Sequence, residues 1–479
     1  MNYSMIIYIT GYILRFQAAF MTLPLITSLL YREKDGYAFL ITMMLCLAAG
    51  ALITRKKPSN KVFYMKEGCV TVAISWIVLS LTGALPFTVS GSIPNYINAV
   101  FETVSGFTTT GASILENVEA LSHCMLIWRS FTHWIGGMGV LVLLLSMLPL
   151  TGGYHMSLMR AESPGPSVSK LVPKVQSTAK ILYIIYFGIT VAEILLLLLG
   201  KMPVFDALCT AFGTAGTGGF GVRSDSIAGY STYIQVVVTI FMILFGINFT
   251  FYYLVLSRKF IQALHVEEIR YYLAIIAVAI IAITVNIRGL YDNIGIALKD
   301  AAFQVSSIIT TTGFATADFN LWPGFSKTIL VLLMFVGACA GSTGGGIKVS
   351  RFLILCKSIR KEIVIYLHPN AVKKVKMDGK SIPHEVVRST NIFMSTYVLI
   401  FAVSVLLISL DEFDLITNFT SVAATLNNIG PGLEIVGPIG NFNMFSGFSK
   451  IVLIFDMLLG RLEIFPMLLL FSKNTWKKF

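Results

Sequence analysis

The chain has 479 residues, of which 56% are hydrophobic and 13% are charged, against roughly 25% charged residues in an ordinary soluble domain. This composition excludes a water-soluble globular protein and the disordered and fibrous classes, and it indicates a polytopic membrane protein. The six cysteines form no CxxC pair, which argues against a disulfide scaffold and against a cysteine-ligated zinc site.

Ten stretches approach the roughly 20 apolar residues that cross a bilayer. They lie at residues 6–30, 37–53, 69–89, 125–150, 181–199, 234–256, 271–287, 328–358, 390–410 and 451–471. The first is read as a retained span, because no basic region and no small-residue cleavage site mark it as a signal peptide. The stretch 328–358 is too long for a single crossing and is broken by glycines.

The basic residues give these spans a direction, because loops rich in lysine and arginine stay in the cytoplasm. Five segments hold 25 of the 36 lysines and arginines, namely residues 54–68, 150–180, 257–270, 348–388 and 472–479. We therefore place these segments and both termini in the cytoplasm. The net charge of +12 is mostly a topology signal, since a nucleic-acid patch would not be divided among five juxtamembrane loops.

The external segments contain apolar runs that are too short to cross the bilayer. These runs lie at residues 96–107, 204–213, 294–309 and 415–426, and each is followed by a turn rich in threonine and glycine. A short apolar run between two full spans is the expected form of a re-entrant helix. The repeating unit is therefore a span, a half-helix, a turn and a second span.

The four turns form an internal repeat with a glycine at a matched place in each unit. The sequence aligns Gly111, Gly218, Gly313 and Gly430, which are 107, 95 and 117 residues apart. Every unit begins and ends in the cytoplasm, so the four copies are parallel and can surround an axis along the membrane normal. We predict an all-α polytopic membrane protein with four span–pore-helix–filter-loop–span repeats around a pseudo-fourfold pore, plus an N-terminal two-helix hairpin.

Irregular backbone at membrane depth must be buried in protein or line a wet cavity, so the four turns are expected to converge. Their carbonyls could then replace the hydration shell of a cation, and the half-helix C-termini would add partial negative charge. No ring of carboxylates marks a divalent-cation filter. For a single turn, an external glycine-rich hairpin is the commoner explanation, whereas four matched copies favour a filter. The predicted filter residues are Thr109, Thr110, Gly111, Gly216, Thr217, Gly218, Thr311, Thr312, Gly313, Asn428, Ile429 and Gly430.

At this point the motifs are similar to those of a known family. The chain resembles the Trk/Ktr/HKT superfamily of potassium transporters, and within it the bacterial TrkH/TrkG type. The resemblance covers essentially the whole chain and rests on the four turns and on the motifs at residues 126–139, 160–166, 337–348 and 460–463.

The resemblance implies a single-chain fold akin to one potassium-channel tetramer, placed in the bacterial inner membrane. It also implies a homodimer regulated by cytoplasmic, nucleotide-binding TrkA-type subunits. In plant relatives a serine at the first filter position accompanies sodium transport, so glycine at Gly111 implies a preference for potassium. The fourth turn departs from the Thr-Thr-Thr pattern, and weaker discrimination than in true potassium channels is expected.

The second span of the third repeat is interrupted by a glycine-rich stretch at residues 337–346. Each glycine costs a helix roughly 1 kcal/mol relative to alanine, so this stretch should unwind and form a gating loop below the filter. A tightly packed helix contact is the alternative, and a nucleotide P-loop is excluded because the glycine–lysine spacing is wrong. The predicted gate residues are Gly337, Gly341, Gly344, Gly345, Gly346 and Arg461.

Arg461 lies deep in the last span, and an intramembrane arginine is a functional candidate by default. It is expected to face the axis as a positive barrier to cations, and an ion pair with another helix is the alternative. By resemblance it matches the family's constriction arginine. His133 lies near Arg129 and is interpreted as a hydrogen-bonded structural histidine. The largest cytoplasmic loop, at residues 357–388, is either a solvated face near anionic lipid or a dock for a regulatory subunit.

The function that fits these features is gated potassium uptake, with potassium held at the filter and no organic cofactor. Transport coupled to protons or sodium is the alternative, and an enzyme is not expected because no catalytic constellation is present. The predicted units are an N-terminal hairpin (1–62) and pore repeats at residues 63–165, 166–262, 263–370 and 371–479.

Overall fold

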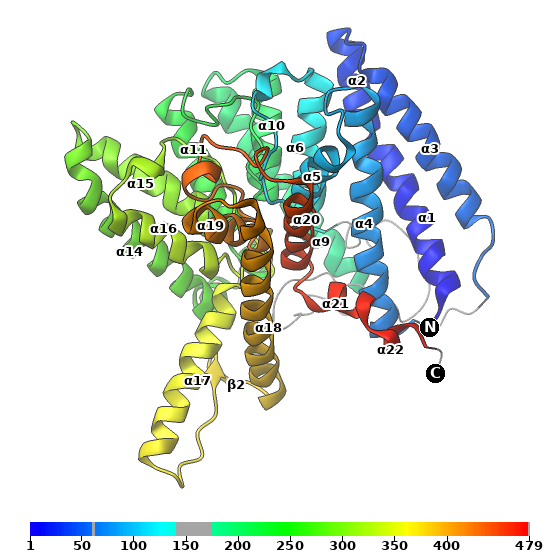
Figure 1. Ribbon diagram of the computed structural model, residues 1–479. Helices are drawn as coiled ribbons and strands as arrows, with labels where there is room; N and C mark the ends of the chain where they lie inside the picture. Colours follow the sequence, from blue (N-terminus) through cyan, green and yellow to red (C-terminus); the bar gives the residue numbers. More distant parts are fainter. Residues whose placement is uncertain (60–62, 140–174, 478–479) are drawn as a thin grey trace.

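The computed structural model describes residues 1–59, 63–139 and 175–477. Within these residues it is built of helices, apart from one short antiparallel hairpin of β1 (Lys376–Met377) and β2 (Lys380–Ser381) (Figure 1). The motif at residues 160–166, the end of the predicted span 125–150 and the unit boundaries at residues 62, 165 and 166 lie outside the described residues. The prediction of an all-α membrane protein is confirmed.

The N-terminal hairpin packs against the first repeat. It consists of α1 (Tyr3–Phe20), α2 (Thr22–Tyr31) and α3 (Gly36–Thr54), and α1 lies between α3 and α4 (Figure 1). The chain ends beside its beginning, where the ring of Trp476 stacks on Tyr3 with centroids 6.2 Å apart. The Tyr3 hydroxyl also donates to the Trp476 carbonyl over 2.7 Å.

Each repeat starts with a long helix, continues with a short half-helix and ends with an inner helix. Repeat 1 has α4 (Met65–Val89), α5 (Tyr96–Phe107), η1 (Val118–Ala120) and α6 (His123–Gly137). Repeat 2 has α9 (Val175–Leu199), α10 (Val204–Gly216), α11 (Thr232–Phe245), α12 (Phe249–Leu256) and α13 (Phe260–Leu264). Repeat 3 has α14 (Glu267–Ile287), η2 (Arg288–Leu290), α15 (Ile294–Ile309), η3 (Phe319–Leu321), α16 (Gly324–Val336) and α17 (Val349–Leu367). Repeat 4 has α18 (His384–Ile408), η4 (Ser409–Asp411), α19 (Leu415–Leu426), η5 (Glu434–Val436), α20 (Gly447–Arg461), α21 (Phe465–Phe471) and α22 (Lys473–Trp476).

The repeats close into a cycle through one recurring contact. The inner helix of each repeat packs against the half-helix of the next, which pairs α6 with α10, α11 with α15, α16 with α19, and α20 with α5. The last pair joins the fourth repeat to the first. This cyclic packing confirms the predicted pseudo-fourfold arrangement, and three of the half-helices have the bounds expected from the sequence.

Helices that cross the bundle without a break and helices that are interrupted occupy different positions in the repeat. Among the described residues, six helical segments are long and apolar enough to cross a membrane, or seven if one bent pair counts as a span. The continuous ones are the N-terminal hairpin and the first helices of the repeats. The inner helices of repeats 2, 3 and 4 are interrupted instead, which places irregular backbone in the middle of the bundle.

Two of these interruptions contradict single spans expected from hydropathy. The predicted span 234–256 bends by 91° between α11 and α12, and the predicted span 451–471 breaks between α20 and α21, where Glu463 and Ile464 have positive φ. Hydropathy does not reveal either break, because it is averaged over about 19 residues and one polar residue, Asn248 or Glu463, does not interrupt an otherwise apolar stretch. The interruption predicted at residues 337–346 is confirmed, since helix is absent there between α16 and α17.

Glu33 joins the N-terminal hairpin to the start of α6. Its carboxylate accepts the backbone N–H groups of His123 over 2.7 Å and Cys124 over 2.9 Å, together with the His123 ring over 2.8 Å. Burial alone would raise the pKa of Glu33, but these hydrogen bonds outweigh burial and hold the pKa below its ordinary value. An acidic group at a helix N-terminus is stabilising because it satisfies free N–H groups and complements the helix dipole.

We expect Glu33→Gln to reduce stability by about 1 kcal/mol at neutral pH, because the charge-assisted cap is lost. The folded-state pKa is depressed, so the contribution of Glu33 is present above the unfolded-state value of about 4.3 and is lost as pH falls through the folded value. Apparent melting temperatures across pH 3–8 measure this, with exposed Glu412→Gln as the control. An equal melting temperature for Glu33→Gln and the parent at pH 7 would contradict the expectation.

Candidate functional site

All four half-helices end with the same hydrogen-bond pattern. In the first, the N–H of Thr109 bonds to the Gly106 carbonyl, and the N–H of Thr110 bonds back to the Ser105 carbonyl over 2.9 Å. The corresponding long bonds in the other three run from Gly218 to Gly213, from Thr312 to Ser307 and from Ile429 to Ala424, each 2.8 Å. This is the Schellman motif, which ends a helix by placing one residue in the left-handed conformation.

These bonds define four equivalent turns, at residues 108–111 (turn 1), 216–219 (turn 2), 310–313 (turn 3) and 427–430 (turn 4). The second residue of each turn is left-handed, with φ between 54° and 59°, and it is Thr109, Thr217, Thr311 or Asn428. The fourth residue also has positive φ and is always glycine, namely Gly111, Gly219, Gly313 or Gly430.

The register predicted for turn 2 is therefore wrong by one residue. Gly218 occupies the place of Thr110, and Gly219 is the equivalent of Gly111. The half-helix α10 also continues to Gly216 rather than ending at residue 213. Gly213 lets α10 pack closely against the residue that follows turn 3, because a β-carbon there would lie 2.9 Å from the ring of Phe314.

The glycines bring the four turns into one closed ring. A β-carbon on Gly111 would overlap the Gly218 carbonyl, one on Gly219 would overlap the Thr312 carbonyl, and one on Gly313 would overlap the Ile429 carbonyl. A β-carbon on Gly430 would lie 2.8 Å from the Thr110 carbonyl, so turn 4 contacts turn 1 and the ring is closed. The four glycines line one cavity of about 130 Å³. All twelve predicted filter residues lie in these four turns, and Gly216 at the start of turn 2 packs against the backbone of His133 in α6.

The left-handed residues are unusual because three of them are β-branched. Threonine in this conformation costs roughly 1–2 kcal/mol, and such strain persists only where the surrounding structure imposes it. Asn428 is better suited to the left-handed region, and its side-chain amide donates to the Thr110 hydroxyl over 3.0 Å and to the Met457 carbonyl over 2.9 Å. Asn428 therefore ties turn 4 to turn 1 and to α20.

The glycine-rich loop at residues 337–348 lies against turns 3 and 4. The N–H of Gly345 donates to the Thr311 hydroxyl over 2.6 Å. β-carbons on Gly344 and Gly345 would lie 3.0 Å from the Thr310 carbonyl and 2.5 Å from the Asn427 carbonyl. The loop thus contacts the first two residues of these turns, whereas the cavity is lined by the fourth residue of each turn. The ring lies between the cavity and the loop.

Neighbouring elements form hydrogen bonds with the backbone N–H and C=O groups of the loop. The loop and the break after α11 bond to each other, from Cys339 to the Gly246 carbonyl and from Phe249 to the Gly341 carbonyl, both over 3.0 Å. Buried Glu268 of α14 accepts the N–H of Ala340 over 2.7 Å and of Ser350 over 3.1 Å. A single carboxylate therefore holds both ends of the loop.

Arg461 joins this loop to the first repeat. Its guanidinium donates to the Thr343 carbonyl over 2.9 Å and to the carbonyls of Gly136 and Gly137 at the end of α6, over 2.5 Å and 2.7 Å. A cation at the C-terminus of a helix complements the helix dipole. Arg461 therefore connects the loop to α6. The three groups to which it donates here are backbone carbonyls.

Several supporting residues were not identified from the sequence. Glu268 and Arg351 are single charged residues at helix ends without a recognisable motif. Glu463 belongs to the motif at residues 460–463, but its ion pair with Arg351, which ties α17 to the break after α20, was not expected. His133 is a structural histidine as predicted, because its ring bonds to the Gly106 carbonyl over 2.9 Å and accepts the N–H of Phe220 over 3.3 Å.

The chemistry available at the ring is that of neutral oxygen donors. Among residues 1–59, 63–139 and 175–477, no group of three or more His, Cys, Asp or Glu side chains could hold a metal ion. Carbonyl and hydroxyl oxygens of the turns are the ligands that suit a weakly hydrated alkali cation.

The comparisons with known proteins agree with this architecture. The TrkH family, described as cation transport protein, matches residues 35–478. The Trk system potassium uptake protein TrkH of Salmonella typhimurium is 37% identical over the full length of both chains. TrkG of Escherichia coli is 36% identical over 98% of this chain and 97% of its own. The crystal structure of the potassium transporter TrkH from Vibrio parahaemolyticus superposes with a TM-score of 0.89, at 33% identity over all of both chains. This chain is a multi-pass membrane protein that belongs to the TrkH family of cation transport proteins.

Proposed function

We propose that this chain carries potassium into the bacterial cell across the inner membrane, with both termini in the cytoplasm. The observation that carries the proposal is the cyclic contact of four equivalent turns around one cavity. Such a ring presents carbonyl oxygens from four directions, as an ion filter requires. The names of the relatives, which are potassium uptake proteins, support potassium as the ion.

The turns are the proposed selectivity filter. Four half-helices direct their C-terminal ends, each carrying roughly half a negative charge, toward the ring. The turns contain no carboxylate, so monovalent cations are favoured over divalent ones. Turn 4 presents Asn428 and Ile429 where turns 1 and 3 present two threonines, so the ring is only approximately fourfold.

The loop at residues 337–348 and Arg461 are the proposed gate. The loop lies on the cytoplasmic side of the ring in the proposed orientation, and Arg461, Glu268 and Thr311 hold it in place. Movement of the loop away from the ring would break these hydrogen bonds. Loss of an anchor should therefore favour the conducting state.

We further propose that the protein works as a homodimer with cytoplasmic TrkA-type subunits that bind nucleotides. The projecting α17, with the β-hairpin and the start of α18, is the proposed dock (Figure 1). This segment is strongly basic and extends beyond the other helices.

Flux measurements in liposomes test the proposal and its alternative. The protein is reconstituted with a potassium gradient, and the reversal potential is measured with and without sodium or proton gradients. We expect reversal at the potassium Nernst potential. Displacement by a second ion would indicate coupled transport, and the absence of alkali-cation flux would overturn the proposal.

Gly111→Ser should admit sodium. Its β-carbon would overlap the Gly218 carbonyl and separate turn 1 from turn 2, so the ring could no longer discriminate by size. We expect the sodium-to-potassium permeability ratio to rise roughly tenfold, equivalent to about 1.4 kcal/mol. Gly188→Ser is the control, because a β-carbon at Gly188 meets nothing within 4 Å. An unchanged ratio would count against the filter assignment.

Arg461→Ala should raise basal potassium flux. The substitution removes three charge-assisted hydrogen bonds, each worth roughly 1.5–3 kcal/mol, so the open fraction should increase by at least tenfold. Single-channel recording separates open probability from unit conductance, and exposed Arg288→Ala is the control. A protein with a lower melting temperature and normal open probability would indicate a structural role only.

Thr311→Val should weaken the contact between loop and ring without changing side-chain volume. The Gly345 N–H loses its acceptor, which costs about 1 kcal/mol and should raise basal flux roughly fivefold. Thr217→Val is the matched control, since Thr217 occupies the equivalent position in turn 2 and its hydroxyl bonds to the adjacent Gly216 carbonyl. Equal effects of the two substitutions would show that the loop contact does not set the closed state.

A further inference from the structure

A buried ion pair lies directly beside the ring, between two helices of the first repeat. Glu102 of α5 and Arg129 of α6 are 1% and 3% exposed. The Arg129 Nε and Nη2 atoms lie 2.8 Å and 2.7 Å from Glu102 Oε1. Removing one partner of such a pair leaves an uncompensated charge at low dielectric, which is much more costly than removing both.

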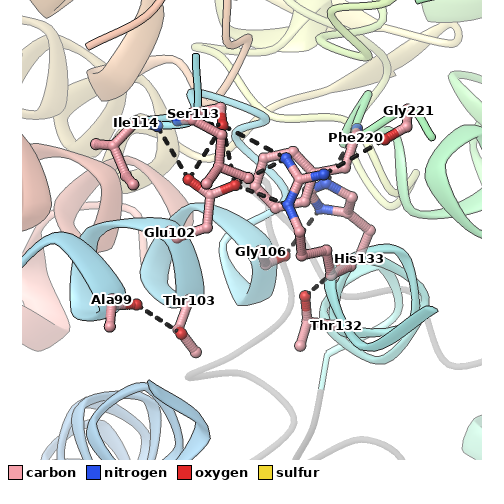
Figure 2. A network of polar contacts seen from close by, with 12 residues as sticks. Ala99, Glu102, Thr103, Gly106, Ser113, Ile114, Thr132, His133, Phe220 and Gly221 are labelled. Atoms are coloured by element: carbon pink, nitrogen blue, oxygen red, sulfur yellow. Dashed lines mark hydrogen bonds and ion pairs between the residues drawn. The ribbon is translucent and has the colours of Figure 1, made fainter. Parts of the chain in front are cut away.

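The pair holds the segments that leave turns 1 and 2 (Figure 2). The Glu102 carboxylate accepts the N–H of Ile114 over 3.0 Å and the hydroxyl of Ser113, both just after turn 1. Arg129 donates to the Gly221 carbonyl over 3.3 Å, and its guanidinium lies 4.1 Å from the ring centroid of Phe220, just after turn 2. One charged unit therefore connects two neighbouring turns.

The same network includes His133, which reaches both turns from the other side. Its ring bonds to the Gly106 carbonyl in α5 and accepts the Phe220 N–H, as Figure 2 shows. Phe220 is thus held between a cation and an imidazole. The backbone at the exit of turn 2 is fixed by two residues of α6.

Arg129 also faces the path proposed for the ion. It lines the cavity that the four ring glycines share. A cation that enters the ring from this cavity passes a guanidinium, whose repulsion is cancelled only because Glu102 lies against it. In a protein interior, whose dielectric constant is well below that of water, an uncompensated charge beside this path lowers the affinity for a cation.

The other repeats carry no charge at the position of Glu102. The register of the turns places Thr210, Gln304 and Ser421 there. Gln304 makes a comparable bond, from its amide to the Ala317 carbonyl over 3.1 Å. A neutral side chain can therefore brace the exit of a turn, so bracing alone does not account for the charge in repeat 1.

We propose that Glu102 and Arg129 form a positioning pair that braces turns 1 and 2 and sets the electrostatic potential at the external entrance of the ring. Glu102 keeps the entrance permissive for cations by cancelling Arg129. The pair is thus a determinant of cation affinity, and the proposal depends on the potassium pathway proposed above.

The test compares Glu102→Gln with the double variant Glu102→Gln/Arg129→Gln in liposomes. In the single variant the guanidinium is uncompensated, so the half-saturating external potassium concentration should rise roughly tenfold. Ba²⁺ is a divalent cation close to K⁺ in size, and its external block should weaken roughly a hundredfold because the electrostatic term doubles with charge. The double variant, which has no net charge at this site, should recover most of the lost potassium affinity and most of the lost Ba²⁺ block.

Glu193→Gln is the control, since Glu193 is a fully buried glutamate of α9 outside this network. A merely structural role predicts that the double variant is impaired at least as much as the single one, and that K⁺ and Ba²⁺ affinities shift equally. Impairment of the double variant to that extent, equal shifts for K⁺ and Ba²⁺, or an unchanged potassium affinity in Glu102→Gln would each overturn the inference. If Glu102→Gln fails to fold, Arg129→Gln tests the same inference, because it leaves the negative charge of Glu102 uncompensated. We then expect tighter external Ba²⁺ block, and weaker block would contradict the inference. Absence of potassium flux in the parent protein would instead refute the proposed function.

Discussion

This structure depends on one constraint: backbone groups that are not in helices must be hydrogen-bonded although the bundle crosses a membrane. Water is absent from the bilayer core, so such groups must bond to other parts of the protein or line a wet cavity. The four turns do both, through Schellman bonds at their helix ends and through a shared cavity. The convergence of the turns is thus a consequence of where their backbone can be solvated.

The same constraint explains how charged residues are used around the ring. Glu268 accepts one N–H group from the loop and one from the first turn of α17, and Arg461 donates to carbonyls of the loop and of α6. These side chains act as caps for irregular backbone rather than as partners for each other. A cap can be released without exposing an unpaired ion if water enters with the movement, which suits elements that must change conformation.

Sequence patterns predicted the parts of the fold that follow from hydropathy and repetition. Three half-helices have the expected bounds, and the loop interrupts the third inner helix where five glycines lower helix propensity. Turn 2 was misaligned because the glycines at 218 and 219 satisfy the pattern equally, and only packing against the Thr312 carbonyl selects Gly219. Hydropathy did not reveal the breaks after α11 and α20, because Asn248 and Glu463 are single polar residues within long apolar stretches. The partnership of Glu102 with Arg129 spans two helices, and no sequence spacing reveals it.

A single chain with four unequal repeats can assign different tasks to equivalent positions, which a symmetric tetramer cannot do. The left-handed residue is Thr311 in turn 3, where it accepts a loop amide, and Asn428 in turn 4, where it bonds to turn 1 and α20. The position of Glu102 is charged in one repeat and neutral in three. The symmetric part of each repeat is the backbone that forms the ring, because all four turns must meet the same steric requirement. The asymmetric part lies one layer outside, where side chains connect the ring to the loop, the cavity and the inner helices. The proposed selectivity and gating can therefore vary through this outer layer while the ring itself stays constant.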